Sequence, residues 1–420
     1  MQPYREQNLQ LIADYLSSGC KQGSRRLGVE MEHTLVHDDG RPVSYSEPGG
    51  VKELLECMSA FYDERHEEQG NIVGLSRPGE NITIEPAAQV EISAGPFESA
   101  ADFAAAYADF RANRFDPLLQ EFGLHAPLTG YNPVAKALDL ELIPKFRYRS
   151  MNKYLGDISP YGPRMMRCTT SLQVSIDFES EQDAARKLRL ANIVAPFFAL
   201  ITDNVPVYEG EPNGVHAMRM RVWEDVDPAR CNVVPGSADP GFTFMDYARY
   251  ILDVPAILVP DETEPEGFRF VGNQTFGEVY ADRVMTRAEL EHAHSMEWPD
   301  NRLKTYIEIR PADAMPAPYA TAFVALVEGL FYSEASLCAM DEAFAAVRHL
   351  DVEAAKWKVI FDGFDARAYG KPAAQWVDWL FSLAHDALDG EEEALLAPLE
   401  DLAAVRLTPR EALHEHCIRK

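Results

Sequence analysis

The spacing of apolar and polar residues predicts several short strands separated by longer helices. In residues 26–36, apolar side chains alternate with Gly, Glu and Glu, which is the period of a strand with one acidic face. A period of two recurs in residues 81–93, 168–178 and 303–310. The stretch 81–93 contains Pro86-Ala87-Ala88 at its centre, so it predicts two short strands joined by a turn.

Apolar residues at helical spacing predict helices between and after these strands. Ser180 is a predicted helix N-cap, with Asp183 at the third helical position. The helices are expected at residues 9–16, 52–64, 99–122 and 181–200, and again almost continuously from about Tyr319 onward.

Strands scattered among helices, several of them joined as hairpins, indicate an α+β fold built around an antiparallel sheet. We find no internal repeat, no low-complexity tract and no clear interdomain linker in the sequence. We therefore expect a single domain over residues 1–420, in which residues 351–420 form a helical carboxy-terminal extension.

The composition is typical of a soluble globular protein, with 46% hydrophobic and 25% charged residues among 420. The longest apolar stretches are shorter than the ~20 residues of a membrane-spanning helix. The first twenty residues contain no apolar core of a signal peptide, and these features predict a cytoplasmic protein.

The chain carries 39 basic and 67 acidic residues, a net charge of −28. This balance argues against binding to nucleic acid or to an anionic membrane, which need a basic surface. Free thiols are expected rather than disulfides or a zinc site, because the six cysteines are scattered and form no C-x-x-C pair: Cys20, Cys57, Cys168, Cys231, Cys338 and Cys417.

Acidic residues on predicted strands are the strongest chemical feature. Glu30 and Glu32 are two apart and project to one side of a strand, while Glu91 and Glu308 lie on other strands and Glu85 precedes the central turn. Carboxylates that converge on one sheet face repel each other unless a hard divalent cation such as Mg²⁺ lies between them. The Glu30–Glu32 pattern alone is also compatible with a solvent-exposed face, and Glu308-Ile309-Arg310 alone with a cross-strand ion pair.

A basic segment interrupts this acidic chain at residues 145–167, where six Lys or Arg residues accompany one acid, Asp157. Arg219 and Arg221 follow, just before Trp223. These arginines suggest a wall that binds carboxylates or phosphates. A basic surface patch paired with acidic helices is the alternative. His292 and His294 have a spacing that can bind metal, but a structural role is favoured for both.

Seven ordered segments resemble the plant-type glutamate–cysteine ligase family, which also occurs in bacteria and makes γ-glutamylcysteine for glutathione. The resemblance covers roughly residues 26–340. It rests on LGVEMEH (27–33), IEPAAQVEISAGP (84–96), RYRSMNKYL (147–155), MMRCTTSLQVSIDFESEQDAARKLR (165–189), EGEPNGVHAMRMRVWEDVDPAR (209–230), FMDYARYILDVP (244–255) and RLKTYIEIRPAD (302–313).

This resemblance implies a fold similar to the catalytic domain of glutamine synthetase, a curved antiparallel sheet forming a funnel with helices packed outside. It implies ATP as co-substrate and more than one Mg²⁺, with glutamate and cysteine joined through γ-glutamyl phosphate. The implied roles are metal binding for Glu30, Glu32, Glu85, Glu91 and Glu308; nucleotide contact for Lys304 and Gln173; substrate binding for Arg147, Arg219, Tyr154 and Trp223; and catalysis for Arg310, which would neutralise charge on the transferring phosphoryl group.

One departure from the family pattern is Pro86-Ala87-Ala88-Gln89, where relatives commonly carry Pro-Gly-Gly-Gln. Glycine adopts positive φ more freely than alanine, so this turn is expected to differ and to alter substrate fit. A γ-glutamyl ligase with another amine acceptor therefore stays open, as does a non-catalytic nucleotide- or metal-binding relative. The sequence also leaves monomer and homodimer open, and shows no transit peptide, which points away from a plastid precursor.

Overall fold

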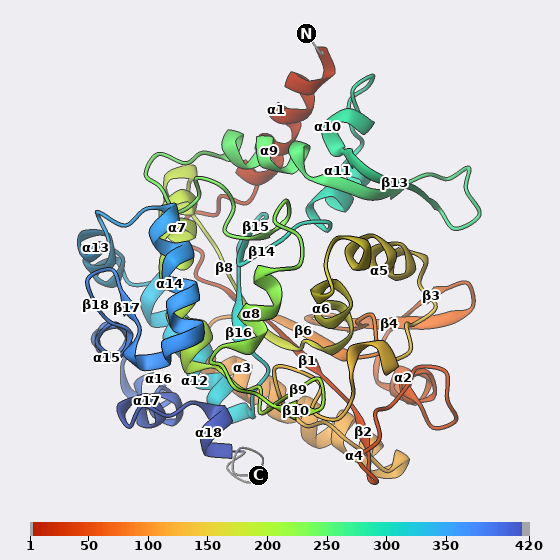
Figure 1. Cartoon of the computed structure of the whole chain (residues 1–420), viewed down its shortest axis with the longest axis horizontal. Helices are drawn as coiled ribbons and strands as arrows, with labels where there is room; N and C mark the ends of the chain where they lie inside the picture. The colour runs from red at the N-terminus through yellow and green to blue at the C-terminus, as the bar shows by residue number, and fades with distance from the viewer. Residues whose placement is uncertain (1–2, 414–420) are drawn as a thin grey trace.

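An eight-stranded antiparallel sheet forms the centre of the computed structural model, which describes residues 3–413 (Figure 1). This confirms the predicted α+β class with an antiparallel sheet. The strand order is β15-β16-β8-β1-β6-β5-β4-β3. The strands are β1 (Leu27–His33), β3 (Glu64–Glu68), β4 (Asn71–Arg77), β5 (Glu80–Ile84), β6 (Val90–Phe97), β8 (Ser171–Ile176), β15 (Asn301–Leu303) and β16 (Ile307–Asp313).

Five further sheets, each of two strands, lie outside the central sheet. Four are antiparallel and the pair β11–β14 is parallel. Their strands are β2 (Val36–His37) with β7 (Leu124–His125), β9 (Val207–Tyr208) with β10 (Glu211–Pro212), β11 (Cys231–Asn232) with β14 (Trp298–Pro299), β12 (Pro255–Pro260) with β13 (Phe268–Thr275), and β17 (Arg367–Ala368) with β18 (Lys371–Pro372).

Helices cover both faces of the central sheet and fill the carboxy-terminal region (Figure 1). They are α1 (Pro3–Ser17), α2 (Val51–Met58), α3 (Ala100–Phe110), α4 (Asp116–Phe122), α5 (Phe146–Ile158), α6 (Tyr161–Cys168), α7 (Glu181–Ile201), α8 (Met218–Glu224), α9 (Phe244–Asp253), α10 (Phe276–Val279), α11 (Arg287–His294), α12 (Ala317–Phe331), α13 (Glu334–Ala343), α14 (His349–Asp362), α15 (Ala373–Ala387), α16 (Gly390–Ala394), α17 (Ala397–Ala404) and α18 (Pro409–Leu413).

The alternation within the strands separates a core face from a polar face. Val29, Val174 and Ile309 belong to the core face and are almost fully buried, and α3, α7 and α12 contact this side of the sheet. On the opposite face, α5, α6 and α8 lie on the viewer's side in Figure 1. The glutamates of β1 and β6 project to this second face, so the sheet pattern itself decides where the chemistry lies.

The stretch 303–310, predicted as one strand, is instead a hairpin of β15 and β16. A turn at Lys304–Tyr306 joins them, and the Lys304 backbone N–H donates to the Tyr306 carbonyl at 2.8 Å. The turn contains no Gly, Pro or Asn that would signal it in the sequence. It packs against the end of α1 so closely that a Cβ on Gly19 would lie 2.5 Å from the Cα of Thr305. A tertiary contact therefore accompanies the break in this strand.

Most predicted helices are present with shifted boundaries. The helix expected at 52–64 ends earlier, because Glu64 already begins β3. The helix expected at 99–122 is continuous through α3 and α4 but contains a π-helical segment, Arg111–Phe115. Ser180 caps α7 as predicted, since its hydroxyl accepts from the Asp183 N–H.

Five cysteines lie among the described residues and all five are free thiols, as expected. Cys417 lies outside the described residues. Within residues 3–413 no single helix has the length and apolar character to cross a membrane. The bent pair α12 and α13 meets that test only when both helices are counted together.

Candidate active site

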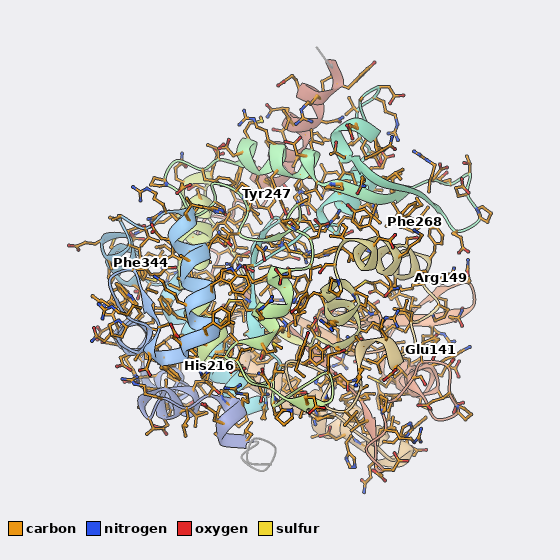
Figure 2. All side chains as sticks on the ribbon, viewed as in Figure 1. Glu141, Arg149, His216, Tyr247, Phe268 and Phe344 are labelled. Atoms are coloured by element: carbon orange, nitrogen blue, oxygen red, sulfur yellow. The ribbon has the colours of Figure 1, made fainter. Side chains whose placement is uncertain are left out.

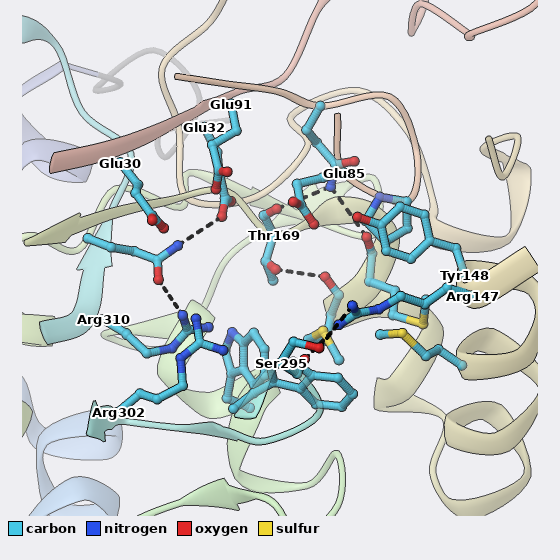
Figure 3. Close-up of a pocket in the computed structure, with 18 of the residues that line it drawn as sticks. Glu30, Glu32, Glu85, Glu91, Arg147, Tyr148, Thr169, Ser295, Arg302 and Arg310 are labelled. Carbon is cyan, nitrogen blue, oxygen red and sulfur yellow. Dashed lines mark hydrogen bonds between the residues drawn. The ribbon is translucent and has the colours of Figure 1, made fainter. Parts of the chain in front are cut away.

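Four glutamates, three from neighbouring strands and one from a turn, meet on the polar face of the central sheet (Figure 3). Glu32 on β1 lies directly opposite Glu91 on β6, and Glu30 lies between Ser93 of β6 and Gln173 of β8. Glu85 comes from the turn between β5 and β6. The strand register thus gathers carboxylates that are far apart in the sequence.

These glutamates line a cavity of about 270 Å³ whose other walls come from helices and from the β15–β16 hairpin. Three methionines and two tryptophans make part of its surface apolar, whereas Arg147, Arg302, Lys304 and Arg310 make part of it cationic. The remaining polar side chains that line it are Gln89, Tyr148, Thr169, Gln173 and Ser295.

Enclosure raises the pKa of all four cavity glutamates. Burial is the main cause, and neighbouring carboxylates add to it: Glu32 helps to raise the pKa of Glu85 to about 7. The pKa of Glu91 lies well above its usual value through burial and the charges of Glu30, Glu85 and Glu32. This cluster of four acids is therefore short of positive charge near its centre.

Local hydrogen bonds fix two of the four carboxylates. Glu32 accepts from the backbone N–H and the hydroxyl of Ser171, both at 2.8 Å. Glu91 accepts from the Thr83 hydroxyl at 2.7 Å. As they stand, no three Asp, Glu, His or Cys side chains within residues 3–413 are grouped tightly enough to hold a metal ion.

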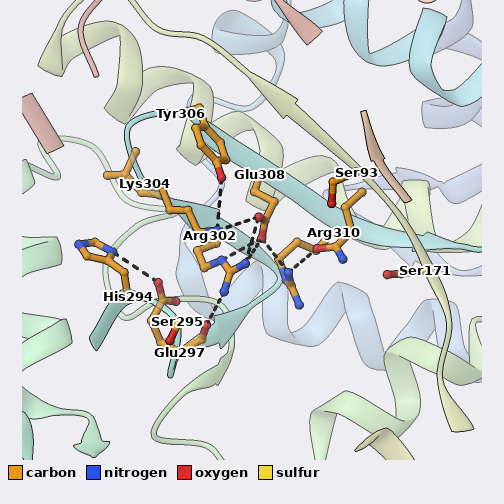
Figure 4. Close-up of polar contacts among 12 residues, drawn as sticks. Ser93, Ser171, His294, Ser295, Glu297, Arg302, Lys304, Tyr306, Glu308 and Arg310 are labelled. Carbon is orange, nitrogen blue, oxygen red and sulfur yellow. Dashed lines mark hydrogen bonds and ion pairs between the residues drawn. The ribbon is translucent and has the colours of Figure 1, made fainter. Parts of the chain in front are cut away.

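Glu308 behaves differently from the four cavity glutamates, because three cations surround it (Figure 4). Its oxygens accept from Arg302 at 2.8 and 3.0 Å, from Arg310 at 2.7 Å and from Lys304 at 3.3 Å. Although burial opposes ionisation, these charges hold the pKa of Glu308 well below its usual range. The cross-strand ion pair that the sequence left open is present, but it joins Glu308 of β16 to Arg302 of β15, whereas Arg310 pairs with Glu308 from the same strand.

Arg310 links this basic group to the glutamates. Its guanidinium donates to the side-chain oxygen of Gln173, whose amide in turn donates to Glu32 at 3.3 Å (Figure 3). It also lies 5.9 Å from the ring centre of Trp223, which lines the cavity.

The predicted basic wall is only partly present. Arg147 of α5 reaches the cavity and donates to the hydroxyl of Ser295 at 3.0 Å and to its carbonyl at 2.6 Å. Arg149, Lys153 and Arg164 pair instead with acids outside the cavity, as the surface-patch alternative predicts.

Two predicted substrate residues do not line the cavity. Tyr154 is buried, with its ring 5.4 Å from the guanidinium carbon of Arg230. Arg219 lies behind the wall, where it donates to the Arg310 carbonyl at 3.0 Å. Rotation about the helix does not explain these positions, because Tyr154 lies two turns beyond Arg147 on the same side of α5, and Arg219 lies one turn before Trp223 on the same side of α8. Each residue is instead separated from the cavity by its distance along the helix and by what packs there.

Arg302, Tyr148 and Ser295 line the cavity but were not predicted as site residues. Arg302 lies directly opposite Glu308 in the β15–β16 register, but the sequence carries no turn signal for this hairpin and so does not reveal the pair. Ser295 carries no sequence signal, since it follows α11 and reaches the cavity only through the tertiary fold. His292 and His294, for which a structural role is favoured, are both buried and neither lines the cavity, and His292 contacts the Leu258 carbonyl at 2.8 Å.

Ala88 in the Ala-Ala turn has the backbone conformation that favours glycine. Ala88 adopts φ 66°, the left-handed conformation that glycine enters freely. Its N–H donates to the Glu85 carbonyl at 2.9 Å, and the Ala87 N–H donates to the side chain of Gln89. Alanine thus occupies a strained backbone conformation here, and the two hydrogen bonds close the turn between Glu85 and Gln89.

Curated proteins similar to this chain are plant enzymes. The chain is 29% identical over 417 residues to the chloroplastic glutamate–cysteine ligase of Medicago truncatula, covering 96% of this chain and 81% of that protein. It is 30% identical over 423 residues to the corresponding enzyme of Arabidopsis thaliana, covering 96% of this chain and 78% of that protein.

A solved structure with the same fold is a glutamate–cysteine ligase from Francisella tularensis, crystallised in complex with AMP. The TM-score is 0.59 at 13% sequence identity, over 94% of this chain and 85% of that one.

The expected cytoplasmic location is wrong by these comparisons, because the similar curated enzymes are named chloroplastic. The expectation that this protein is not a plastid precursor is wrong for the same reason. Both inferences rested on absent features, namely a membrane-spanning stretch, a signal peptide and a transit peptide, and such an absence does not establish a compartment.

The profile of the glutamate-cysteine ligase family 2 matches residues 26–415, a range that contains the glutamates, the hairpin and the helices of the cavity. The chain belongs to this family.

Proposed function

We propose that this protein is an ATP-dependent ligase that joins the γ-carboxylate of glutamate to the amine of cysteine, with γ-glutamyl phosphate as intermediate. The observation that carries this proposal is the cavity itself, in which four glutamates face a basic group around Arg310. Family membership supports the same activity.

The donor set fits Mg²⁺, which prefers oxygen ligands and tolerates few protein carboxylates per ion. The raised pKa values of Glu30, Glu32, Glu85 and Glu91 indicate that a cation among them would be favourable. Bound there, one or more Mg²⁺ ions would neutralise the phosphates of ATP. Glu308 would join this set only by giving up part of its contact with the three cations around it.

A second cavity of about 640 Å³ adjoins the first at Glu30 and gives room for the nucleoside part of ATP. Tyr306 lines this second cavity, whereas Lys304, two residues earlier, lines the first. We infer that the triphosphate crosses from one cavity to the other beside Lys304 and Gln173.

The chain's own residues would then position the reactants. Arg147, held by Ser295, presents a guanidinium to the carboxylates of glutamate. Arg310 lies beside the carboxylate cluster and would neutralise charge on the transferring phosphoryl group. Trp223 shields Arg310 on one side, so that the acyl phosphate would meet the amine rather than bulk water.

We further infer that the central sheet forms a funnel like that of glutamine synthetase. The whole chain would act as one catalytic domain, with residues 351–420 as an extension of it that is mainly helical over its described part, residues 351–413.

The decisive experiment is an acceptor screen with ATP, Mg²⁺ and glutamate. We expect γ-glutamylcysteine by mass spectrometry, with one ADP released per product, and slower turnover when serine or alanine replaces cysteine. Equal rates with another amine would change the assigned acceptor. An absence of nucleotide turnover with every amine would contradict the ligase assignment.

The metal assignment is tested by titrating Mg²⁺ in Glu30→Gln. The Mg²⁺ concentration at half-maximal rate should rise by about tenfold or more, since even residues behind metal ligands contribute that much. Glu64→Gln is the matched control, because Glu64 is an exposed glutamate on the same sheet. Wild-type turnover of Glu30→Gln at limiting Mg²⁺ would remove Glu30 from the ligand set.

Arg310→Met tests the role of the basic group. Loss of one preorganised charge at the transferring phosphoryl group should cost about 3 kcal/mol of barrier, seen as a lower kcat. An unchanged kcat would exclude Arg310 from the mechanism.

A further inference from the structure

A lysine in the carboxy-terminal region is buried directly behind the cavity. Lys356 lies on α14, has 0% exposure, and forms ion pairs with Glu224 and with Asp300, the latter at 2.6 Å. Burial raises the pKa of Glu224 to about 7 even beside this lysine. A buried cation between two acids from distant segments joins those segments firmly.

Each of the two acids is adjacent to residues that line the cavity. Glu224 ends α8 and directly follows Trp223, while Asp300 lies between Trp298 and Arg302. Figure 1 shows α14 beside α8, on the side of the molecule that carries the site.

Both connections converge on Arg310. The ring of Trp223 lies 5.9 Å from its guanidinium carbon. The carbonyl of Asp300 accepts from the backbone N–H of Arg310 at 3.2 Å. Lys356 is therefore paired with the acid next to Trp223, which contacts the Arg310 side chain, and with Asp300, which accepts from the Arg310 backbone. Lys356 itself does not line the cavity.

We propose that Lys356 is a positioning residue, which fixes Arg310 through Glu224 on one side and Asp300 on the other. This inference rests on the proposed function of Arg310. It gives the helical carboxy-terminal region a part in the active site, since the cation between the two wall segments comes from α14.

The test compares Lys356→Met with Lys358→Met, because Lys358 is exposed on the same helix two residues away. Circular dichroism gives the folded fraction of each variant, and rates are expressed per folded molecule. A purely structural role would lower the folded fraction and leave KM for ATP unchanged. Misplacement of Arg310 should instead raise KM for ATP and lower kcat/KM by about tenfold to a hundredfold, as small displacements in active sites do. Lys358→Met should equal wild type.

Asp300→Asn and Glu224→Gln keep the test decisive if Lys356→Met does not fold. Each variant removes one of the two ion pairs of Lys356 and retains the other, so each should raise KM for ATP by less than Lys356→Met does. Lys356→Arg should recover part of the loss because it keeps the charge. Wild-type KM and kcat in all folded variants would overturn the proposal.

Product formation by the wild-type protein shows whether the proposed function holds, independently of the role of Lys356. If the wild-type protein makes no γ-glutamyl product, the proposed function fails. The positioning role is then judged from the dissociation constant of ATP with Mg²⁺ by calorimetry, and equal values for wild type and Asp300→Asn overturn it.

Discussion

Arg302 and Glu308 face each other across the β15–β16 hairpin and are joined by two hydrogen bonds of 2.8 and 3.0 Å. The pair is buried, and Glu308 also forms ion pairs with Lys304 and Arg310. This two-point contact fixes the hairpin that carries three of the cations lining the cavity, Arg302, Lys304 and Arg310. A lysine has the same charge but lacks the planar fork.

Arg302→Lys should therefore fold and retain the charge, yet lose part of the geometry. We expect a loss of about 1–2 kcal/mol in the free energy of unfolding, because one charge-assisted hydrogen bond is removed. Arg302→Met should cost more, since it leaves Glu308 with two cations. Urea denaturation of both variants measures this order, and equal stability of the two would contradict it.

Arg410 connects α18 to a buried acid. Its guanidinium lies 3.4 Å from Asp203, whose carboxylate oxygens have no side-chain hydrogen-bond partner among the described residues. Burial raises the pKa of Asp203 to about 6. Arg410→Met should destabilise the protein by about 3–5 kcal/mol at pH 8, because it leaves a buried charge unpaired.

The same variant should lose less stability at pH 5, where Asp203 takes up a proton and no longer needs a partner. Thermal denaturation at the two pH values measures the difference, and the double variant Arg410→Met with Asp203→Asn should recover stability at pH 8. A loss that is independent of pH would show that Asp203 is not its cause.

Glu328 gives the apo protein a pH-dependent stability. Burial raises its pKa to about 7, and it accepts from the Ala100 N–H at 2.8 Å. The folded state then binds more protons than the unfolded state between about pH 4.5 and pH 7, so this glutamate lowers stability as the pH rises through that range.

Glu328→Gln should remove this effect, because the amide oxygen still accepts from Ala100 and carries no charge. We expect a gain of about 1–3 kcal/mol at pH 8 and little change at pH 4.5, measured by denaturant unfolding at each pH. Glu64→Gln, at an exposed position, serves as the control. A gain of the same size at both pH values would contradict the assignment.

Ala88→Gly tests the departure from the family turn. Because Ala88 already adopts φ 66°, glycine should retain the backbone path and leave KM for glutamate within about twofold. Relief of strain, the lost methyl contact and the greater freedom of the unfolded chain oppose one another, so stability should change by less than about 1 kcal/mol. A large change in KM would show that the methyl group itself contacts the substrate.

The strand pattern was sufficient to predict which glutamates share a face. Glu30, Glu32 and Glu91 alternate with apolar residues, and the period of two leaves them one side of the sheet. The N-cap of α7 could also be predicted from the local sequence, because the Ser180 side chain accepts a hydrogen bond from the Asp183 N–H only three residues away. Periodicity and capping act within a few residues, and for that reason the sequence alone reports them.

The local sequence does not determine which basic and aromatic residues reach the cavity. Arg147, Tyr154 and Arg219 had equal claims in the sequence, but only Arg147 lines the cavity. The turn at Thr305 has no turn residues, and packing against Gly19 accompanies it. The family resemblance singled out these residues, whereas the packing of α5 and α8 against the sheet decided which of them line the cavity.

The sequence by itself determined the family, the α+β class and the acidic face of the sheet, because these follow from motifs and from alternation along the chain. Only the tertiary structure decided that Arg302 pairs with Glu308, that Ser295 holds Arg147, and that Lys356 lies behind the cavity. Such contacts join residues whose separation no local pattern encodes, and they form because burial of each charge requires a partner that the fold brings to it.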